Sequence, residues 1–207
     1  SGIYEAAEKG EWKRRAEFMG YQIRNKTVGV IGFGNIGSRV GSILRDGFAC
    51  KLLAYDPYQS DEMLREKGAI PVSLEQLLQE SDIISLNAFI NDKSYHLIKE
   101  EQIKQMKGHV MIVNTARGEL VDDRALIQAV MDRKIFSYGA DVVEGEPIDS
   151  NHPLFSSPYI TITPHTSAYT FECLEGMGEK CVSDCEKVFA GKATVNLVNK
   201  ELIEHTC

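Results

Sequence analysis

The sequence has no long hydrophobic run, and none of its apolar stretches approaches the roughly 20 residues that a membrane-spanning helix requires. Residues 1–5 have neither the positive charge nor the apolar core of a secretion signal. Positive charge is also scarce: the net charge is -7, and lysine and arginine are scattered without forming a basic block. These absences argue against membrane and nucleic-acid partners.

Cysteine pairs with the spacing of a redox or metal site are missing as well. The sequence contains no Cys-x-x-Cys and no HExxH motif. Its five cysteines are an odd number, so we expect reduced thiols in a cytoplasmic protein. Cys181 and Cys185 are four residues apart, which on a helix could place two metal ligands on one face. Both also follow the helical spacing of Leu174, Met177 and Val188, which favours small core residues instead. We therefore predict no metal site.

Glycine is concentrated where an apolar strand pattern at residues 27–31 runs into a helical pattern. Gly32, Gly34 and Gly37 have the spacing G-x-G-x-x-G. Gly32 would make a tight turn, Gly34 would let the backbone approach a pyrophosphate, and Gly37 would let the helix pack close to the strand. The phosphates would lie at the helix N-terminus. Three glycines alone are a weak signal, but the strand, turn and helix around them favour a dinucleotide site.

The next apolar run ends in Asp56, roughly 20 residues after the glycines. An acidic residue there can accept hydrogen bonds from the adenosine ribose hydroxyls, although an Asp before Pro57 can also simply open a turn. Asp56 would repel a 2′-phosphate, and residues 57–60 contain no cation. We therefore expect NAD rather than NADP.

The 207 residues, 43% of them hydrophobic, are enough to bury a full core. Short β-rich runs alternate with segments of helical period. We predict strands at residues 27–31, 51–55, 82–86, 109–114, 137–142 and 159–163. We predict helices at residues 36–44, 61–67, 73–79, 100–106, 122–131 and 169–190. This alternation predicts a doubly wound parallel α/β sheet of the Rossmann type, in three αβα layers, with residues 1–207 as one dinucleotide-binding domain.

The segment before the first strand, residues 4–18, is charged and carries the single tryptophan, Trp12. It could pack on a partner, or it could be a solvated helix with Trp12 tucked against its own domain. We leave both alternatives open.

Three polar residues follow predicted strands, where a parallel sheet binds its ligands. Arg117 follows the strand at 109–114, Glu146 the strand at 137–142, and His165 the strand at 159–163. Near a nicotinamide, Arg117 could hold a carboxylate and polarise a keto oxygen, while His165 donates a proton to that oxygen and Glu146 favours the imidazolium. Each residue alone also has an ordinary structural explanation. Together they suggest reduction of a 2-keto acid.

Longer stretches around these residues carry a more specific pattern. They are the glycine motif with Asp56, residues 114–122, residues 139–147 and residues 162–166. Their order and spacing, from about Trp12 to the end, resemble the NAD-binding domain of the D-isomer-specific 2-hydroxyacid dehydrogenase family. In that family the strand ending near Leu86 is usually followed by a His-x-Pro-Leu-Thr type loop, whereas this chain reads Asn-Ala-Phe-Ile-Asn at residues 87–91.

The resemblance implies a cofactor, a substrate class and roles for individual residues. Arg117, Glu146 and His165 would be catalytic. The implied cofactor-binding residues are Gly32, Gly34, Asn35, Ile36, Gly37, Asp56, Thr115 and Asp141, of which Ile36 would lie against the pyrophosphate and Asp141 would face the nicotinamide amide. The cofactor would be NAD, and the substrate a small 2-keto or 2-hydroxy acid. The implied assembly is a homodimer, with residues 1–20 as a helical segment and candidate dimer element.

Family members also carry a substrate-binding domain, which this sequence does not supply. The resemblance thus implies the cofactor-binding domain of a longer oxidoreductase acting on the CH-OH group of D-2-hydroxy acids, with residues 187–207 leading back toward the missing domain. The alternative is a non-enzymatic NAD-sensing corepressor of the same fold, since such relatives keep the Arg, Glu and His. A corepressor would be expected to have peptide-binding surfaces or long disordered tails, and the sequence shows neither. We therefore favour the enzyme.

Overall fold

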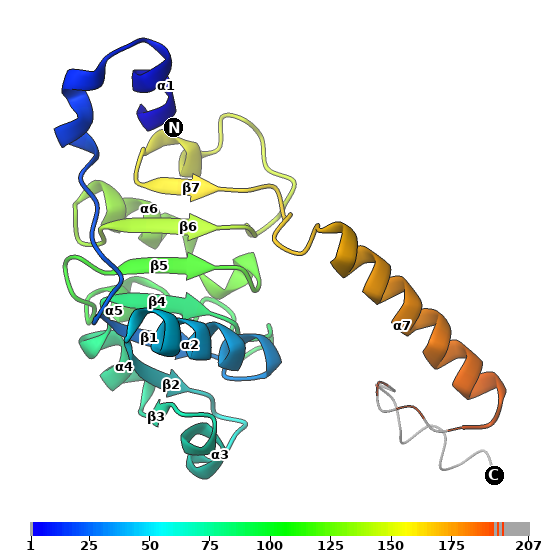
Figure 1. Cartoon of the computed structure of the whole chain (residues 1–207). Coiled ribbons are helices and arrows are strands. Elements are labelled where there is room, and N and C mark those ends of the chain that lie inside the picture. The colour runs from blue at the N-terminus through cyan, green and yellow to red at the C-terminus, as the bar shows by residue number, and fades with distance from the viewer. Residues whose placement is uncertain (1, 193, 195, 197–207) are drawn as a thin grey trace. The chain divides into compact units, whose positions relative to one another are not determined.

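The computed structural model describes residues 2–192, 194 and 196. It divides the chain into two units, Ser1–His165 and Thr166–Cys207 (Figure 1). The first unit contains the sheet, and the second contains the long helix α7 (Phe171–Phe189). Among the described residues, no helix is both long enough and apolar enough to cross a membrane.

The first unit is built on a parallel sheet of seven strands in the order β3-β2-β1-β4-β5-β6-β7. The strands are β1 (Thr27–Ile31), β2 (Lys51–Tyr55), β3 (Ile70–Pro71), β4 (Ile83–Leu86), β5 (Met111–Asn114), β6 (Ser137–Ala140) and β7 (Ile160–Ile162). The chain winds outward from β1 to β3 and then returns to β4 on the other side of β1. This reversal between β1 and β4 is the point at which sheets of this class bind ligands, beyond the carboxyl ends of the strands. The predicted doubly wound Rossmann-type fold is confirmed.

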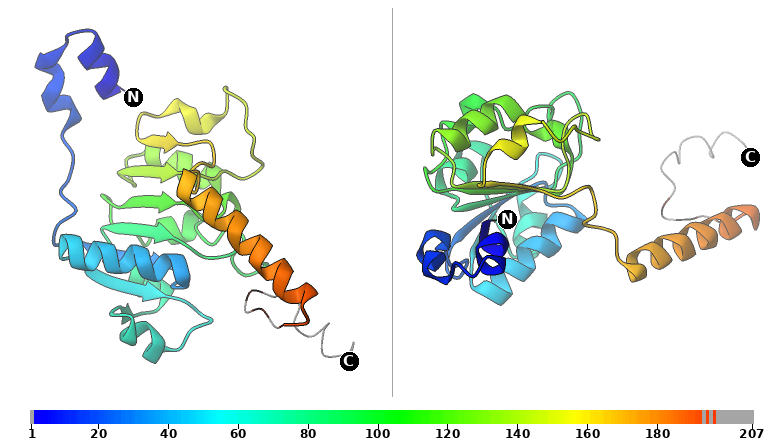
Figure 2. Two further views of the ribbon diagram at one scale, coloured as in Figure 1. Left: turned by 45° about the vertical axis from the view of Figure 1, so that its right-hand side comes forward. Right: turned by 90° about the horizontal axis from the view of Figure 1, so that it is seen from above.

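Helices cover both faces of the sheet (Figure 2). The α-helices of this unit are α1 (Gly2–Glu8), α2 (Asn35–Phe48), α3 (Asp61–Glu66), α4 (Leu74–Glu80), α5 (Glu100–Ile103) and α6 (Asp123–Met131). Short 3-10 helices are η1 (Trp12–Phe18), η2 (Gly118–Leu120) and η3 (Pro153–Ser156). Helix α2 packs on β1 and β2, whereas α4, α5 and α6 form a consecutive layer on the opposite face. Right-handed crossovers require this change of face when the winding direction reverses.

Two buried clusters correspond to the two faces. The smaller lies on the α2 side and includes Val28, Val30 and Leu52. The larger lies on the α4 to α6 side and includes Ile84 and Ile112. Burial on both faces explains why the strands of a parallel sheet are nearly continuous apolar runs.

Some predicted element boundaries were wrong for local reasons. Helix α5 ends at Ile103 rather than residue 106, because Gln105 and Met106 donate backbone hydrogen bonds three residues back instead of four. Strand β5 begins at Met111 rather than residue 109, because the Val110 N–H closes a turn onto the Lys107 carbonyl. Strand β3 was not predicted: its two residues, Ile70 and Pro71, are too few to show a period.

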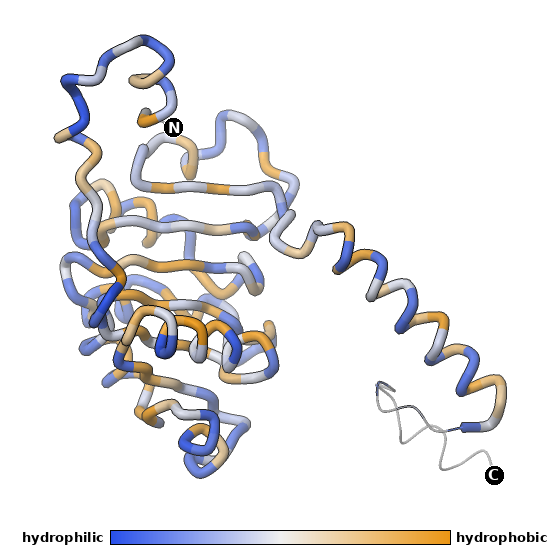
Figure 3. The backbone as a smooth tube through the Cα atoms, in the orientation of Figure 1, coloured by the Kyte–Doolittle hydropathy of each residue, from blue (hydrophilic) through white to orange (hydrophobic). Residues whose placement is uncertain are grey.

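Helix α7 corrects the interpretation of Cys181 and Cys185. Hydrophilic and hydrophobic residues alternate along this helix, as Figure 3 shows, yet none of its residues is buried. Both thiols are exposed, so they are not the core residues that their spacing suggested. A helical apolar stripe predicts a buried face only where another element covers it. Among the described residues, no group of three or more His, Cys, Asp or Glu side chains is arranged to hold a metal ion.

The exposure of the N-terminal segment bears on one of the two alternatives that its sequence left open. Trp12 is 73% exposed in η1, so it is not tucked against its own domain. Ile3 and Tyr4 of α1 are also exposed, whereas Ala6 is buried. The segment therefore exposes Ile3, Tyr4 and Trp12, whereas Phe18 is partly buried.

Asp82, just before β4, connects β1 with the segment before β5 at the amino ends of these strands. Its contacts give a prediction about acid stability. Its carboxylate accepts hydrogen bonds from the Thr27 backbone N–H (2.9 Å), Lys107 Nζ (2.8 Å) and His109 Nε2 (3.0 Å). Burial alone would raise the pKa of Asp82, but these donors outweigh it and lower the pKa to about 2. Because the folded pKa is depressed, the stabilisation is complete above the unfolded value of 3.8 and is lost as the pH falls toward 2.

We expect Asp82→Asn to lower the free energy of unfolding by about 2 kcal/mol at neutral pH, and by much less near pH 2. Urea unfolding followed between pH 2 and pH 7 measures both values. Asp61→Asn, at the exposed start of α3, is the matched control. An equal loss for Asp82→Asn at both ends of this pH range would contradict the electrostatic explanation.

Candidate active site

The glycine loop between β1 and α2 has the geometry that its spacing predicted. Gly32 has a φ of +83°, and a Cβ there would lie 2.6 Å from the backbone N of Ala88. A Cβ on Gly37 would lie 2.0 Å from the carbonyl oxygen of Gly32, so α2 approaches the strand end closely. Gly34 faces open space and is the N-cap of α2, where no side chain caps the first N–H groups. The loop is therefore a backbone cradle with exposed donors, which suits a phosphate.

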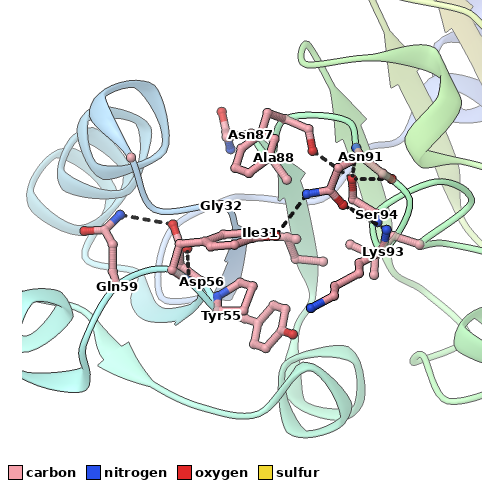
Figure 4. Close-up of a pocket in the computed structure, with 15 residues that line it drawn as sticks. Ile31, Gly32, Tyr55, Asp56, Gln59, Asn87, Ala88, Asn91, Lys93 and Ser94 are labelled. Carbon is pink, nitrogen blue, oxygen red and sulfur yellow. Dashed lines mark hydrogen bonds between the residues drawn. The ribbon is translucent and has the colours of Figure 1, made fainter. Parts of the chain in front are cut away.

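Asp56 lies at the end of β2 and points toward this loop. Its Oδ2 accepts hydrogen bonds from the Phe33 backbone N–H (2.8 Å) and from Gln59 Nε2 (3.0 Å), and its Oδ1 accepts one from the Tyr58 N–H (2.9 Å). A cavity of about 430 Å³ lies beside it, with Gly32, Gly34 and Asp56 in its lining (Figure 4). Asp56, after β2, thus lines the same cavity as Gly32 and Gly34, which follow β1.

The loop after β4 forms the wall of this cavity opposite Asp56. The rings of Phe89 and Tyr58 have centroids 5.1 Å apart, and Asn91 Nδ2 donates to Tyr58 Oη at 2.9 Å. Lys93 lines the cavity from the same loop (Figure 4). The cation that residues 57–60 lack is therefore supplied to the cavity wall by another loop. The departure from the family pattern at residues 87–91 was the sequence signal that this loop is unusual.

Asn87, the first residue of that loop, also lines the cavity. Its amide donates to Ser85 Oγ at 3.0 Å, while its buried Oδ1 has no hydrogen-bond partner among the described residues. Buried acceptors are normally paired, and an orphaned one in a cavity wall is consistent with a wall that a bound molecule completes.

A second cavity, of about 310 Å³, extends from the glycine loop toward Arg117. It is lined by Ile36, Asn87, Ala88, Phe89, Ile90, Thr115, Ala116 and Arg117. Asn114 at the end of β5 shapes the turn that presents Arg117: its Oδ1 accepts from the Ala116 N–H (3.0 Å) and its Nδ2 donates to the Arg117 carbonyl (2.9 Å). Asn114 was not predicted as a site residue, although it is buried and polar at a strand end.

Arg117, Glu146 and His165 come together in a third cavity, of about 320 Å³. Glu146 Oε1 and His165 Nδ1 form a hydrogen bond, and Glu146 Oε2 accepts from the Val143 N–H at 3.1 Å. About half of the His165 side chain is exposed, and its φ is +54°. Because the carboxylate engages Nδ1, Nε2 is the imidazole nitrogen that the pair does not use. The three residues predicted from separate strand ends therefore lie in one cavity.

Asp141 lies at the end of β6 and is buried. Its carboxylate accepts a hydrogen bond from Thr163 Oγ1. Of the other predicted cofactor residues, Asn35 and Ile36 are exposed at the start of α2, and Thr115 is exposed after β5. All of the predicted site residues lie near the carboxyl ends of the strands or in the loops that follow them.

Comparisons with known proteins relate this chain to one family. Residues 2–167 match the model of the D-isomer specific 2-hydroxyacid dehydrogenase, NAD binding domain. Glyoxylate reductase from Thermococcus litoralis is 37% identical over 200 residues, which cover 94% of this chain and 60% of that protein. Glyoxylate reductase from Korarchaeum cryptofilum is 34% identical over 95% of this chain and 60% of its own length.

Solved structures of related enzymes align with this chain over a similar share of its length. D-lactate dehydrogenase from Aquifex aeolicus, complexed with NAD and lactic acid, aligns with a TM-score of 0.80 and 34% identity over 91% of this chain and 61% of that one. D-lactate dehydrogenase with NAD+ from Lactobacillus jensenii aligns with a TM-score of 0.83 and 29% identity over 95% of this chain and 62% of that one. The chain spans about 60% of the length of the curated relatives that it matches. The chain therefore belongs to the D-isomer-specific 2-hydroxyacid dehydrogenase family, which it matches in the NAD-binding domain.

Proposed function

We propose that this chain is the cofactor-binding and proton-transferring part of an NAD-dependent oxidoreductase that acts on the CH-OH group of D-2-hydroxy acids and reduces 2-keto acids. One observation carries the proposal: the hydrogen-bonded pair Glu146–His165 shares a cavity with Arg117 at the strand ends beside the glycine loop. A guanidinium and a carboxylate-oriented imidazole are the groups that a 2-keto acid needs for binding and protonation.

The residues around the first two cavities fit NAD. Gly34 and the uncapped N-terminus of α2 would hold the pyrophosphate, with Ile36 against it, and Asp56 would accept hydrogen bonds from the ribose hydroxyls. Gly32 and Gly37 would keep the turn tight, and Asn35, Thr115 and Asp141 would complete the contacts. When bound, NAD supplies or accepts the hydride.

The remaining steps belong to the third cavity. Arg117 would bind the substrate carboxylate through two parallel hydrogen bonds and polarise the keto oxygen. His165 would donate its Nε2 proton to that oxygen, and in the reverse direction it would remove the hydroxyl proton. Glu146 would hold the imidazole in place through Nδ1.

The relatives support a small 2-keto acid as the substrate class. The relatives with similar sequences include glyoxylate reductases, and the solved structures with similar folds include D-lactate dehydrogenases. Arg117, Glu146 and His165 are exposed or only partly buried in this chain. A substrate domain in the full-length protein would close over them and exclude water.

We also propose a homodimer in which residues 1–20 contact a second copy of the chain. The exposed side chains of Ile3, Tyr4 and Trp12 support this assembly, because large apolar and aromatic residues are enriched in interface cores. A cytoplasmic location is supported by the described cysteines, which are all free thiols.

Calorimetric titration with NADH and NADPH tests the cofactor assignment. We expect NADH to bind, and Asp56→Ala to weaken binding by about tenfold or more, because hydrogen bonds to a charged acceptor are lost. Asp61→Ala at the start of α3 is the control, and thermal unfolding checks that each variant is folded. Tighter binding of NADPH than of NADH, assisted by Lys93, would contradict the assignment. Absence of NADH binding would contradict the proposed site.

A further inference from the structure

Glu144 lies two residues before Glu146, in the loop after β6, but its carboxylate is directed toward another loop. Its Oε1 accepts a hydrogen bond from Tyr95 Oη at 2.7 Å, and its Oε2 lies 2.8 Å from His96 Nε2. The Tyr95 and His96 rings are stacked, with centroids 4.0 Å apart and planes inclined by 16°. Both oxygens of Glu144 are therefore engaged by neighbouring residues of the loop after β4.

The position of His96 is specified by the backbone as well as by this contact. His96 has a φ of +47°, which a residue with a side chain rarely adopts. Its N–H donates to the Glu119 carbonyl at 2.8 Å, in the turn that follows Arg117. The same turn is pressed against the loop after β6, since a Cβ on Gly118 would lie 2.1 Å from the Glu144 backbone N. Three loops thus meet at Glu144.

These loops have different tasks in the proposed reaction. The loop after β4 forms one wall of the nucleotide cavity through Phe89, Asn91 and Lys93, only a few residues before Tyr95 and His96. The loop after β6 carries Glu146, whose N–H and Oε2 both bond to the Val143 backbone. A rigid attachment between the two loops would fix the position of the Glu146–His165 pair relative to the nucleotide cavity.

The electrostatics of this contact favour an ionised Glu144. The His96 hydrogen bond lowers the pKa of Glu144, and the Tyr95 hydrogen bond adds to this effect, although partial burial opposes both. Asp122, Asp123, Arg124 and His152 line a cavity of about 510 Å³ together with Glu144 and His96. The carboxylate remains charged because its two donors are well placed, despite the acidic neighbours.

We propose that Glu144 is a positioning residue that holds the Glu146–His165 pair in place relative to the nucleotide cavity. This inference rests on the proposed function, in which Glu146 orients His165. Glu144 acts through Glu146 and needs no contact with substrate or cofactor.

The test measures the tautomer of the neutral His165 imidazole by long-range ¹H–¹⁵N NMR on the full chain, with the signal assigned by its loss in His165→Gln. If Glu146 is held in place, its carboxylate accepts a hydrogen bond from Nδ1–H, and the Nδ1–H tautomer dominates. We expect Glu144→Gln to lower that tautomer's population by about twofold or more. Tyr95→Phe, which removes one donor, should have a smaller effect. Asp149→Asn removes a carboxylate from the same loop and should have none.

Several outcomes decide the question. An unchanged His165 tautomer in a folded Glu144→Gln chain would overturn the proposal. If Glu144→Gln unfolds, the double variant Tyr95→Phe/His96→Gln keeps the carboxylate and replaces it in the test, and an unchanged tautomer there would overturn the proposal equally. Calorimetry on the same samples separates this result from the proposed function: a wild-type chain that binds no NADH contradicts the cofactor site, whereas the tautomer is measured without cofactor.

Discussion

His165→Gln in the full-length protein is expected to lower kcat/KM for 2-keto acid reduction by about 10²- to 10⁴-fold, while NADH affinity stays within about twofold. The reason is that Gln cannot donate a proton to the developing alkoxide. Glu146 contacts the imidazole through Nδ1, so Nε2 is the proposed proton donor. The substitution removes this donor together with the rest of the ring. Steady-state kinetics with glyoxylate and pyruvate, together with calorimetric titration of NADH, measure the two effects.

His109→Gln is the control for this prediction. His109 also faces a carboxylate, Asp82, but it lies at the opposite end of the strands from the active-site cavity. We expect it to change stability slightly and kcat/KM little. A His165→Gln enzyme with nearly full activity would rule out the proton-donor role. A wild-type protein that binds NADH but reduces none of the 2-keto acids would favour the NAD-sensing corepressor.

Gly37→Ala is expected to have the largest structural effect at the cofactor site. The added Cβ would lie 2.0 Å from the Gly32 carbonyl oxygen and 3.1 Å from Val30 Cγ1, so α2 must move away from β1. We expect a loss of about 2–3 kcal/mol in the free energy of unfolding, as for other overpacked cores. NADH affinity should fall by about tenfold or more, because the helix N-terminus that receives the phosphates is displaced.

Gly47→Ala on the same helix gives a matched control. Nothing lies within 4 Å of a Cβ at Gly47, so alanine should stabilise α2 by about 0.5–1 kcal/mol through its helix propensity. Urea unfolding should therefore show a lower stability for Gly37→Ala and a higher stability for Gly47→Ala. NADH titration of both variants measures the cofactor affinity. If Gly37→Ala matched the wild type in both measurements, close packing of the helix on the strand would not be needed for binding.

Most of the architecture could be predicted because it is encoded locally. The glycine spacing, the apolar strand runs and the polar residues that follow them each lie within a few neighbouring residues. Strands β1 and β2 have the predicted bounds, and Gly32 has the positive φ that its turn requires. Parallel winding then brings the carboxyl ends of the strands to one edge, which explains why Arg117, Glu146 and His165 share a cavity.

Contacts between loops were not predictable in the same way. Tyr58 meets Asn91, and Glu144 meets Tyr95 and His96, across separations of 33, 49 and 48 residues. The periodicity of a sequence does not predict such a pair. Loop conformation depends on individual backbone angles, such as the positive φ of His96. The placement of Lys93 in the wall opposite Asp56 has the same origin.

The sequence by itself therefore determined the fold class, the dinucleotide loop and the identities of the candidate catalytic residues, since these follow from residue type and local spacing. The tertiary structure decided which surfaces are covered and which loops meet. Trp12, Cys181 and Cys185 are exposed although their sequence context allowed burial, and the contacts of Glu144 appear only after three loops have packed together. The physical reason is that an apolar stripe or a charged side chain specifies a preference for a partner, whereas the partner itself is selected by the packing of distant segments.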